Sequence, residues 1–92
     1  MFKITMRAGG IDPGVGLGAA EDIQNEFRVH RRRHERVTCT FFDGALTLVA
    51  FNDFDSDGMA LSDEFSDCLS AYIPLEGISD DGVFEVVPVE TV

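Results

Sequence analysis

The chain contains no tryptophan, three prolines and two cysteines among its 92 residues. Its apolar runs are short, and none approaches the roughly 18 consecutive residues that a membrane-spanning helix requires. The first ten residues alternate apolar and polar side chains and lack the apolar segment of a signal peptide. We therefore expect both cysteines to be reduced thiols in a cytosol, since disulfides are typical of exported proteins.

Lysine and arginine are absent after residue 36, and this absence divides the chain in two. The overall net charge is −10, but residues 1–36 hold seven basic and five acidic residues and sum to +2. Residues 37–92 hold twelve acidic residues and no basic ones, and they sum to −12. A net negative charge repels free nucleic acid, which argues against a plain DNA- or RNA-binding domain. The uneven distribution predicts a molecule with surfaces of opposite charge.

The length of the chain predicts one domain, residues 1–92, because domains usually contain roughly 50–250 residues. Hydrophobic residues make up 45% of it, which is ordinary for a globular protein. Alternating apolar and polar side chains predict a strand over residues 2–8. The glycine-rich segment 9–18 predicts a loop. Apolar side chains then recur at helical spacing and predict a helix over about residues 19–30.

The clearest local pattern is a β-hairpin closed by Asp43-Gly44. Asp-Gly between two alternating segments favours a two-residue type I′ turn, in which both residues have positive φ. Closing the hairpin there puts apolar residues opposite apolar residues on one face, so both strands predict the same core side. The expected pairs are Phe41 with Leu46, Cys39 with Leu48 and Val37 with Ala50 on the core face, and Arg36 with Phe51 on the other.

The second half of the chain adds a helix and a strand. Apolar residues at helical spacing predict a helix that ends before Pro74, with Ser62 as its N-cap. Residues 83–89 are β-branched enough to form a final strand, and Pro88 indicates an edge position or the strand end. The order β-α-β-β-α-β predicts an α+β, ferredoxin-like fold: a four-stranded antiparallel sheet with two helices on one face. The other face would be a candidate docking surface that includes Lys3, Arg7, Phe42, Val49 and Phe51.

Residues 53–64 match the calcium-loop pattern D-x-[DN]-x-[DN]-G-x₅-E in full. Carboxylates at these spacings supply the oxygen ligands that calcium prefers. The ligands would be Asp53, Asp55, Asp57 and Glu64. However, a strand and not a helix leads into the loop, and there is no second loop to pair with it. The alternative interpretation is an acidic connection whose carboxylates favour the N-terminus of the following helix, with no metal.

Three further patterns predict no catalytic chemistry. Residues 14–19 fit a dinucleotide-binding fingerprint formally, but an antiparallel hairpin is the wrong context for it. His30 and His34 have the spacing of metal ligands on a helix, but they have no third ligand nearby, so we assign them to a basic patch. Cys39 and Cys68 fall on predicted core faces, where a thiol behaves as a small apolar group. We expect neither an enzyme nor a cofactor.

The most unusual segment is the arginine segment, residues 28–36. One interpretation is a solvated cluster that offsets part of the acidic charge within the fold. The other is a binding site, because the planar guanidinium suits phosphates and carboxylates and such dense like charges repel one another without an anion across them. An assembly that presents lysine-rich protein beside bound RNA would match both charged halves of the chain. The arginines of the segment are Arg28, Arg31, Arg32, Arg33 and Arg36.

With its small size, acidity, α+β pattern and embedded HRRRHER sequence, the chain resembles the small phage-encoded anti-CRISPR proteins directed at the type I-F (Csy) complex. The resemblance rests on the whole chain and on no shared motif, and the basic cluster departs from the purely acidic DNA mimics of that group. It implies a stoichiometric inhibitor, monomeric when free, that binds the crRNA-loaded complex without a cofactor in the cytoplasm of an infected bacterial host. It implies that target DNA binding or hybridisation is blocked.

On this hypothesis the two charged halves of the chain contact different parts of the complex. The arginines of the arginine segment would contact RNA phosphate or acidic patches, whereas the carboxylates of the second half would face basic subunits. Those carboxylates are Asp53, Asp55, Asp57, Asp63 and Asp67. We expect no binding of free DNA and no association with a membrane. A calcium-binding module built on residues 53–64 is the alternative function.

Overall fold

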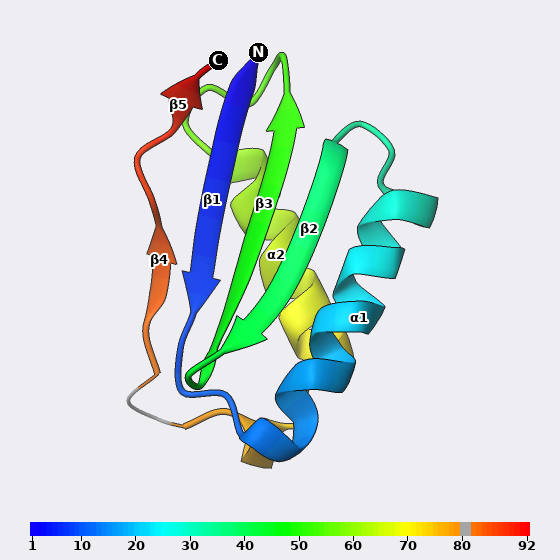
Figure 1. The fold of residues 1–92 in the computed structure, drawn as a ribbon, viewed down its shortest axis with the longest axis vertical. Coiled ribbons are helices and arrows are strands. Elements are labelled where there is room, and N and C mark those ends of the chain that lie inside the picture. Colours follow the sequence, from blue (N-terminus) through cyan, green and yellow to red (C-terminus); the bar gives the residue numbers. More distant parts are fainter. Residues whose placement is uncertain (80–81) are drawn as a thin grey trace.

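The computed structural model describes residues 1–79 and 82–92, and Figure 1 shows its elements. The strands are β1 (Phe2–Ala8), β2 (Glu35–Phe42), β3 (Ala45–Asn52), β4 (Phe84–Val86) and β5 (Glu90–Thr91). The helices are α1 (Pro13–His30), α2 (Met59–Tyr72) and a short 3₁₀ helix, η1 (Leu75–Gly77). The predicted α+β class is therefore confirmed.

The strands form one antiparallel sheet in the order β2-β3-β1-β4, and β5 also pairs with β1. Figure 1 shows α2 behind the sheet and α1 beside the edge strand β2, and buried residues of both helices form one core cluster with buried residues of the strands. The predicted order is not matched in full, because the single final strand expected over residues 83–89 is two short strands. Pro88 lies between them, where it has no N–H to donate to β1.

The core lies between the sheet and the two helices, where apolar side chains from both layers form one buried cluster. Its largest fully buried side chains include Phe27 on α1, Phe65 on α2, and Met6 and Leu48 on the sheet. Alternate residues of β1 and β3 are buried, as the sequence pattern predicts. Burial of this cluster stabilises the fold, since each buried large apolar side chain contributes about 1.5–3 kcal/mol.

Helix α1 begins at Pro13, six residues earlier than predicted, so the loop expected over residues 9–18 is wrong over most of its length. Asp12 is the N-cap, and its Oδ1 accepts a hydrogen bond of 2.8 Å from the Gly14 N–H. Pro13 favours the first helical position because its φ is already suitable and its missing N–H has no partner there. These start signals outweigh the low helix propensity of the glycines. The formal dinucleotide fingerprint is simply the first two turns of this helix.

The hairpin prediction is confirmed at its turn and over most of its register. Asp43 and Gly44 have φ of 52° and 76°, as a type I′ turn requires, and Phe41 pairs with Leu46. The register shifts between Glu35 and Thr38, so it contains neither the predicted pairing of Val37 with Ala50 nor that of Arg36 with Phe51, and Glu35 pairs with Phe51 instead. Arg36 has a positive φ of 49°, a conformation typical of the irregular position in such a bulge.

Two glycines in the first turns of α1 give a matched test of this packing. A Cβ on Gly16 would lie 2.3 Å from Cε1 of the Phe41 ring, whereas a Cβ on Gly18 meets nothing within 4 Å in the described structure. We expect Gly18→Ala to stabilise the protein by about 0.5–1 kcal/mol through helix propensity. We expect Gly16→Ala to destabilise it by about 1–2 kcal/mol, because overpacking costs more than the propensity returns. Urea unfolding followed by circular dichroism measures both, and equal stabilisation by both substitutions would contradict the helix packing described.

Candidate interaction surfaces

The arginine segment spans the end of α1, a turn at residues 31–34 and the start of β2. Two of its guanidinium groups bind the same carboxylate on α2. Arg33 donates a hydrogen bond of 2.7 Å to Glu64 Oε1, and Arg31 Nη1 lies 3.5 Å from Glu64 Oε2. Arg31 Nε also lies 3.3 Å from Glu26 Oε2, without the alignment of a hydrogen bond. Part of the basic charge predicted to face a partner is therefore bound to acids of the same chain.

The environment of Arg31 keeps its positive charge. Burial opposes the charged form, but the neighbouring Cys68, Glu64 and Glu26 together outweigh it, so the pKa of Arg31 is raised above its ordinary value. The guanidinium lies 5.7 Å from the centre of the Phe27 ring, at the edge of the core. Arg31 is thus a structural ion-pair residue that ties the end of α1 to α2.

Three other arginines of the segment are exposed to solvent. Arg28 Nε donates a hydrogen bond of 3.2 Å to the Val37 carbonyl on the outer edge of the sheet. Arg36 lies over the Phe51 ring at 4.2 Å, on the sheet face without helices. Arg32 makes no hydrogen bond or ion pair within residues 1–79 and 82–92. Arg32 is therefore the member of the segment that is most available to an external anion.

The edge strand β2 is blocked in part by side chains of α1. In addition to the Arg28 contact with Val37, Gln24 Oε1 accepts a hydrogen bond of 2.9 Å from the Cys39 N–H. Both backbone groups would otherwise offer pairing to another strand, which is a common route to aggregation. Arg28 therefore has a structural contact that the charge pattern alone did not indicate.

His34 is buried and not part of a basic surface patch, so that expectation is wrong for this residue. Asn52 Oδ1 accepts hydrogen bonds from the N–H groups of Phe54 and Asp55. The Asn52 amide nitrogen therefore faces His34 Nδ1, at 3.0 Å, and donates to it. This assigns the imidazole proton to Nε2, which lies 3.3 Å from Glu64 Oε1. His30, by contrast, is exposed at the end of α1.

The acidic loop, residues 53–58, caps the N-terminus of α2. Asp55 is only 4% exposed, and its two carboxylate oxygens accept hydrogen bonds of 3.1 and 3.0 Å from the N–H groups of Ala60 and Leu61. Asp57 Oδ1 accepts from the Met59 N–H at 3.0 Å. The helix starts after Gly58, so the prediction of Ser62 as N-cap is wrong. Asp55 is also too buried to face a partner, contrary to the expectation for it.

The carboxylates of the calcium-loop pattern do not converge. Both oxygens of Asp55 bind the backbone of α2, and Glu64 points toward Arg31, Arg33 and His34. In the described part of the chain, no group of three or more histidine, cysteine, aspartate or glutamate side chains is placed to hold a metal ion. The alternative interpretation of the pattern, a helix cap, describes this geometry. Of the five carboxylates expected to face basic subunits, four are exposed: Asp53, Asp57, Asp63 and Asp67.

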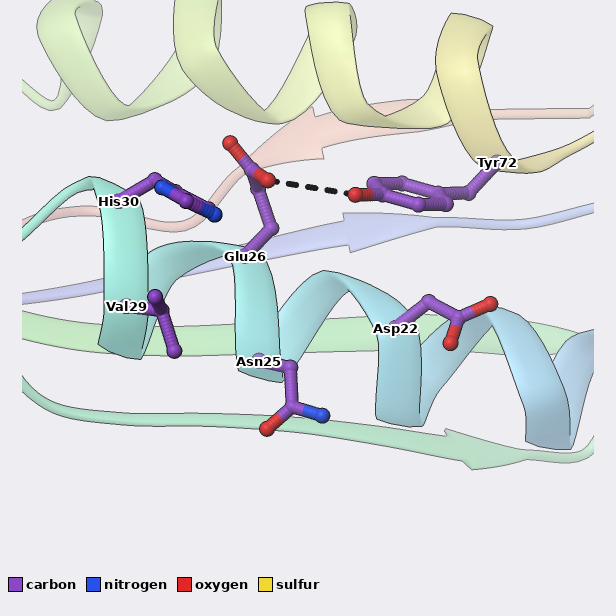
Figure 2. Close-up of a pocket in the computed structure, with 6 residues that line it drawn as sticks. All are labelled: Asp22, Asn25, Glu26, Val29, His30 and Tyr72. Atoms are coloured by element: carbon purple, nitrogen blue, oxygen red, sulfur yellow. Dashed lines mark hydrogen bonds between the residues drawn. The ribbon is translucent and has the colours of Figure 1, made fainter.

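A pocket of about 290 Å³ lies between α1 and α2, and the sequence patterns did not indicate it. Five of its lining residues belong to α1 and one to α2. Figure 2 shows Tyr72 reaching from α2 toward Glu26, where the Tyr72 hydroxyl donates a hydrogen bond of 3.2 Å to Glu26 Oε1. The lining residues are Asp22, Asn25, Glu26, Val29, His30 and Tyr72.

One wall of this pocket could have been predicted from the sequence, because its residues recur at helical spacing, at positions 22, 25, 26, 29 and 30. Residues three and four apart share one face of a helix, so Asp22, Glu26 and His30 lie in a row along α1. Nothing in the sequence indicates that Tyr72 lies opposite, because that contact joins residues 46 positions apart.

The sheet face without helices carries the predicted residues but has mixed charge. Phe42 is 83% exposed, whereas Val49 and Phe51 are half-buried. Lys3 Nζ lies 4.0 Å from Glu90 Oε2, and Arg7 lies opposite Glu85 in the register of β1 and β4. Acids of β4 and β5 therefore lie beside Lys3 and Arg7, whereas Arg36 lies over the ring of Phe51.

Both cysteines are buried thiols, as predicted. Burial, with a contribution from the neighbouring Cys68, raises the pKa of the Cys39 thiol to about 12. Burial also raises the pKa of Cys68, although Arg31 acts in the opposite direction. Both side chains therefore stay protonated near neutral pH, and neither has the low-pKa environment of a nucleophilic cysteine.

Comparison of the chain with protein families, with curated proteins and with solved structures gave no match. Among the described residues, no helix has both the length and the apolar character needed to cross a bilayer.

We predict that Asp55→Ala destabilises the protein by about 2–3 kcal/mol, because it removes a helix cap and leaves buried N–H groups without an acceptor. Asp53→Ala removes the same charge at an exposed position and should change the free energy of unfolding by less than about 0.5 kcal/mol. Thermal unfolding with and without calcium measures both effects. A calcium-dependent rise in Tm that both substitutions abolish would support the calcium-binding alternative instead.

Tyr72 provides a test of the pocket geometry, because it is the only tyrosine and the chain has no tryptophan. Partial desolvation and the nearby Glu26 carboxylate, which accepts its hydrogen bond, raise the pKa of the Tyr72 hydroxyl. A spectrophotometric titration should therefore give a pKa above that of a free tyrosine. Glu26→Gln should lower this pKa, since it removes the negative charge that disfavours the phenolate; an unchanged value would show that the two side chains are apart in solution.

Proposed function

We propose that the protein is a non-enzymatic inhibitor that binds the crRNA-loaded type I-F CRISPR surveillance complex and prevents target DNA binding or hybridisation. The observation that supports a binding role most directly is that Arg32 is exposed and makes no hydrogen bond or ion pair with any residue that the structure describes, with the exposed Arg28 and Arg36 in the same segment. The identity of the target rests on the resemblance of the whole chain. The site of action would be the cytoplasm of the infected bacterial host.

The contacts within the fold reduce the set of residues that we propose to contact the complex. Arg31 and Arg33 both pair with Glu64, so they position the segment, although Arg33 is 68% exposed and remains accessible from one side. On the acidic side we retain Asp53, Asp57, Asp63 and Asp67 as partner-facing residues and omit the buried Asp55. Electrostatic matching of this kind acts mainly on association rate and specificity.

We also propose that the architecture is ferredoxin-like with a divided last strand. The neighbour order β2-β3-β1-β4, with every pair antiparallel, supports this assignment. The fold by itself assigns no function, because it occurs in proteins of many activities.

The direct test is co-purification with a crRNA-loaded type I-F complex at moderate salt, followed by a target DNA-binding assay. We expect a stable complex and loss of target DNA binding. If no complex forms, the proposed function is wrong.

Arg32→Glu should weaken this binding by at least about tenfold, because an exposed arginine at an interface contributes about 1.4 kcal/mol or more. Arg7→Glu makes the same change in net charge on β1 and outside the arginine segment, and it serves as the matched control. Surface plasmon resonance on the immobilised complex measures both variants. Equal losses for the two would show that only overall charge matters and would refute the assignment of the site to this segment.

A further inference from the structure

We propose that the pocket between α1 and α2 is a docking site for a lysine side chain of a protein partner. This pocket lies on the helical layer; Val29 and His30 of the arginine segment line it, but none of the arginines of that segment does. The proposal therefore does not depend on the identity of the target proposed above, and it can fail or succeed separately.

The size of the pocket fits one side chain. Its volume of about 290 Å³ lies at the lower end of the roughly 300–1,000 Å³ that is typical of small-molecule and cofactor sites. It is also open to solvent, so a side chain of a docked protein can reach it.

The residues that line the pocket favour a side chain with an apolar chain and a positively charged end. Asp22 and Glu26 lie one helical turn apart and present two carboxylates on the same face of α1 (Figure 2). The Val29 side chain and the Tyr72 ring supply apolar and aromatic surface. A lysine side chain has four methylene groups for such surface and an ammonium group with three hydrogen-bond donors.

The two carboxylates are not equally occupied within the chain. Glu26 accepts a hydrogen bond from Tyr72 and pairs with Arg31, so it is already part of the link between the helices. Asp22 is exposed and makes no hydrogen bond or ion pair in the part of the chain that the structure describes. A charged hydrogen bond from an ammonium to Asp22 would therefore be gained without breaking an internal contact.

The exposed charged residues of the two helices are mostly acidic. Apart from Asp22, they are Glu21 and Arg28 on α1, and Asp63 and Asp67 on α2. A lysine-bearing surface would be attracted to these acids before the side chain enters the pocket. The pocket would therefore bind one lysine side chain at a defined position, whereas the other acids of the two helices attract cations without a specific site.

The test uses an octalysine peptide and the fluorescence of Tyr72, which is the only tyrosine and lies in the pocket wall. We expect a saturable change in tyrosine fluorescence that weakens as salt is raised. The same peptide with every side chain Nε-acetylated keeps the stem but lacks the charge, and it should give no change. A response to the acetylated peptide, or no saturable response to octalysine, would overturn the proposal.

Asp22→Asn should weaken octalysine binding by about tenfold, which corresponds to the loss of one charged hydrogen bond. Asp43→Asn removes the same charge from the exposed turn of the hairpin, where asparagine suits the positive φ and no side chain lines the pocket, and it should weaken binding by less than about twofold. Equal losses for the two variants would show diffuse attraction to the net negative charge and would refute a specific lysine site. Neither substitution alters an internal hydrogen bond of the described structure, so both variants should fold.

Discussion

The carboxylate of Glu64 is the point on which the arrangement of the charged residues depends. It binds Arg33, lies within ion-pair distance of Arg31 and faces His34, and it joins the turn after α1 to the first turns of α2. Its side chain is only 13% exposed, so this contact is screened less than a surface pair and its loss would leave buried polar groups unpaired. Through His34 and Asn52 the same network reaches the loop that caps α2.

This network explains why the two oppositely charged halves of the sequence do not form two fully opposite surfaces. Where the halves meet, Glu64 of the second half pairs with Arg31 and Arg33 of the first, and Arg31 also lies beside Glu26. The exposed charges that remain include Arg32 and its neighbours at the turn, and the carboxylates of the two helices, the acidic loop and the edge strands. The net charge of −10 therefore describes the acidic surfaces but not the turn after α1.

The features that the sequence predicted correctly depend on local patterns. The Asp43-Gly44 turn needs only two positive φ values, and the alternation on either side then sets the register as far as Thr38. The sequence signals for the start of α1 are also local, because they lie in Asp12 and Pro13, but the glycine-rich composition of the segment led to the prediction of a loop. That prediction failed because Gly16 has a packing role: it gives the ring of Phe41 the space that a Cβ would fill.

The candidate sites were harder to predict because they depend on contacts between distant residues. The spacing of Asp53, Asp55, Asp57 and Glu64 is identical in a calcium loop and in a helix cap followed by an ion pair, and only the arginines, some 30 positions away, distinguish the two. The same holds for the pocket, where α1 supplies a recognisable row of acids but Tyr72 closes it from another helix. A charged pattern in a sequence therefore becomes evidence for a site only when the partners that compete for those charges within the fold are known.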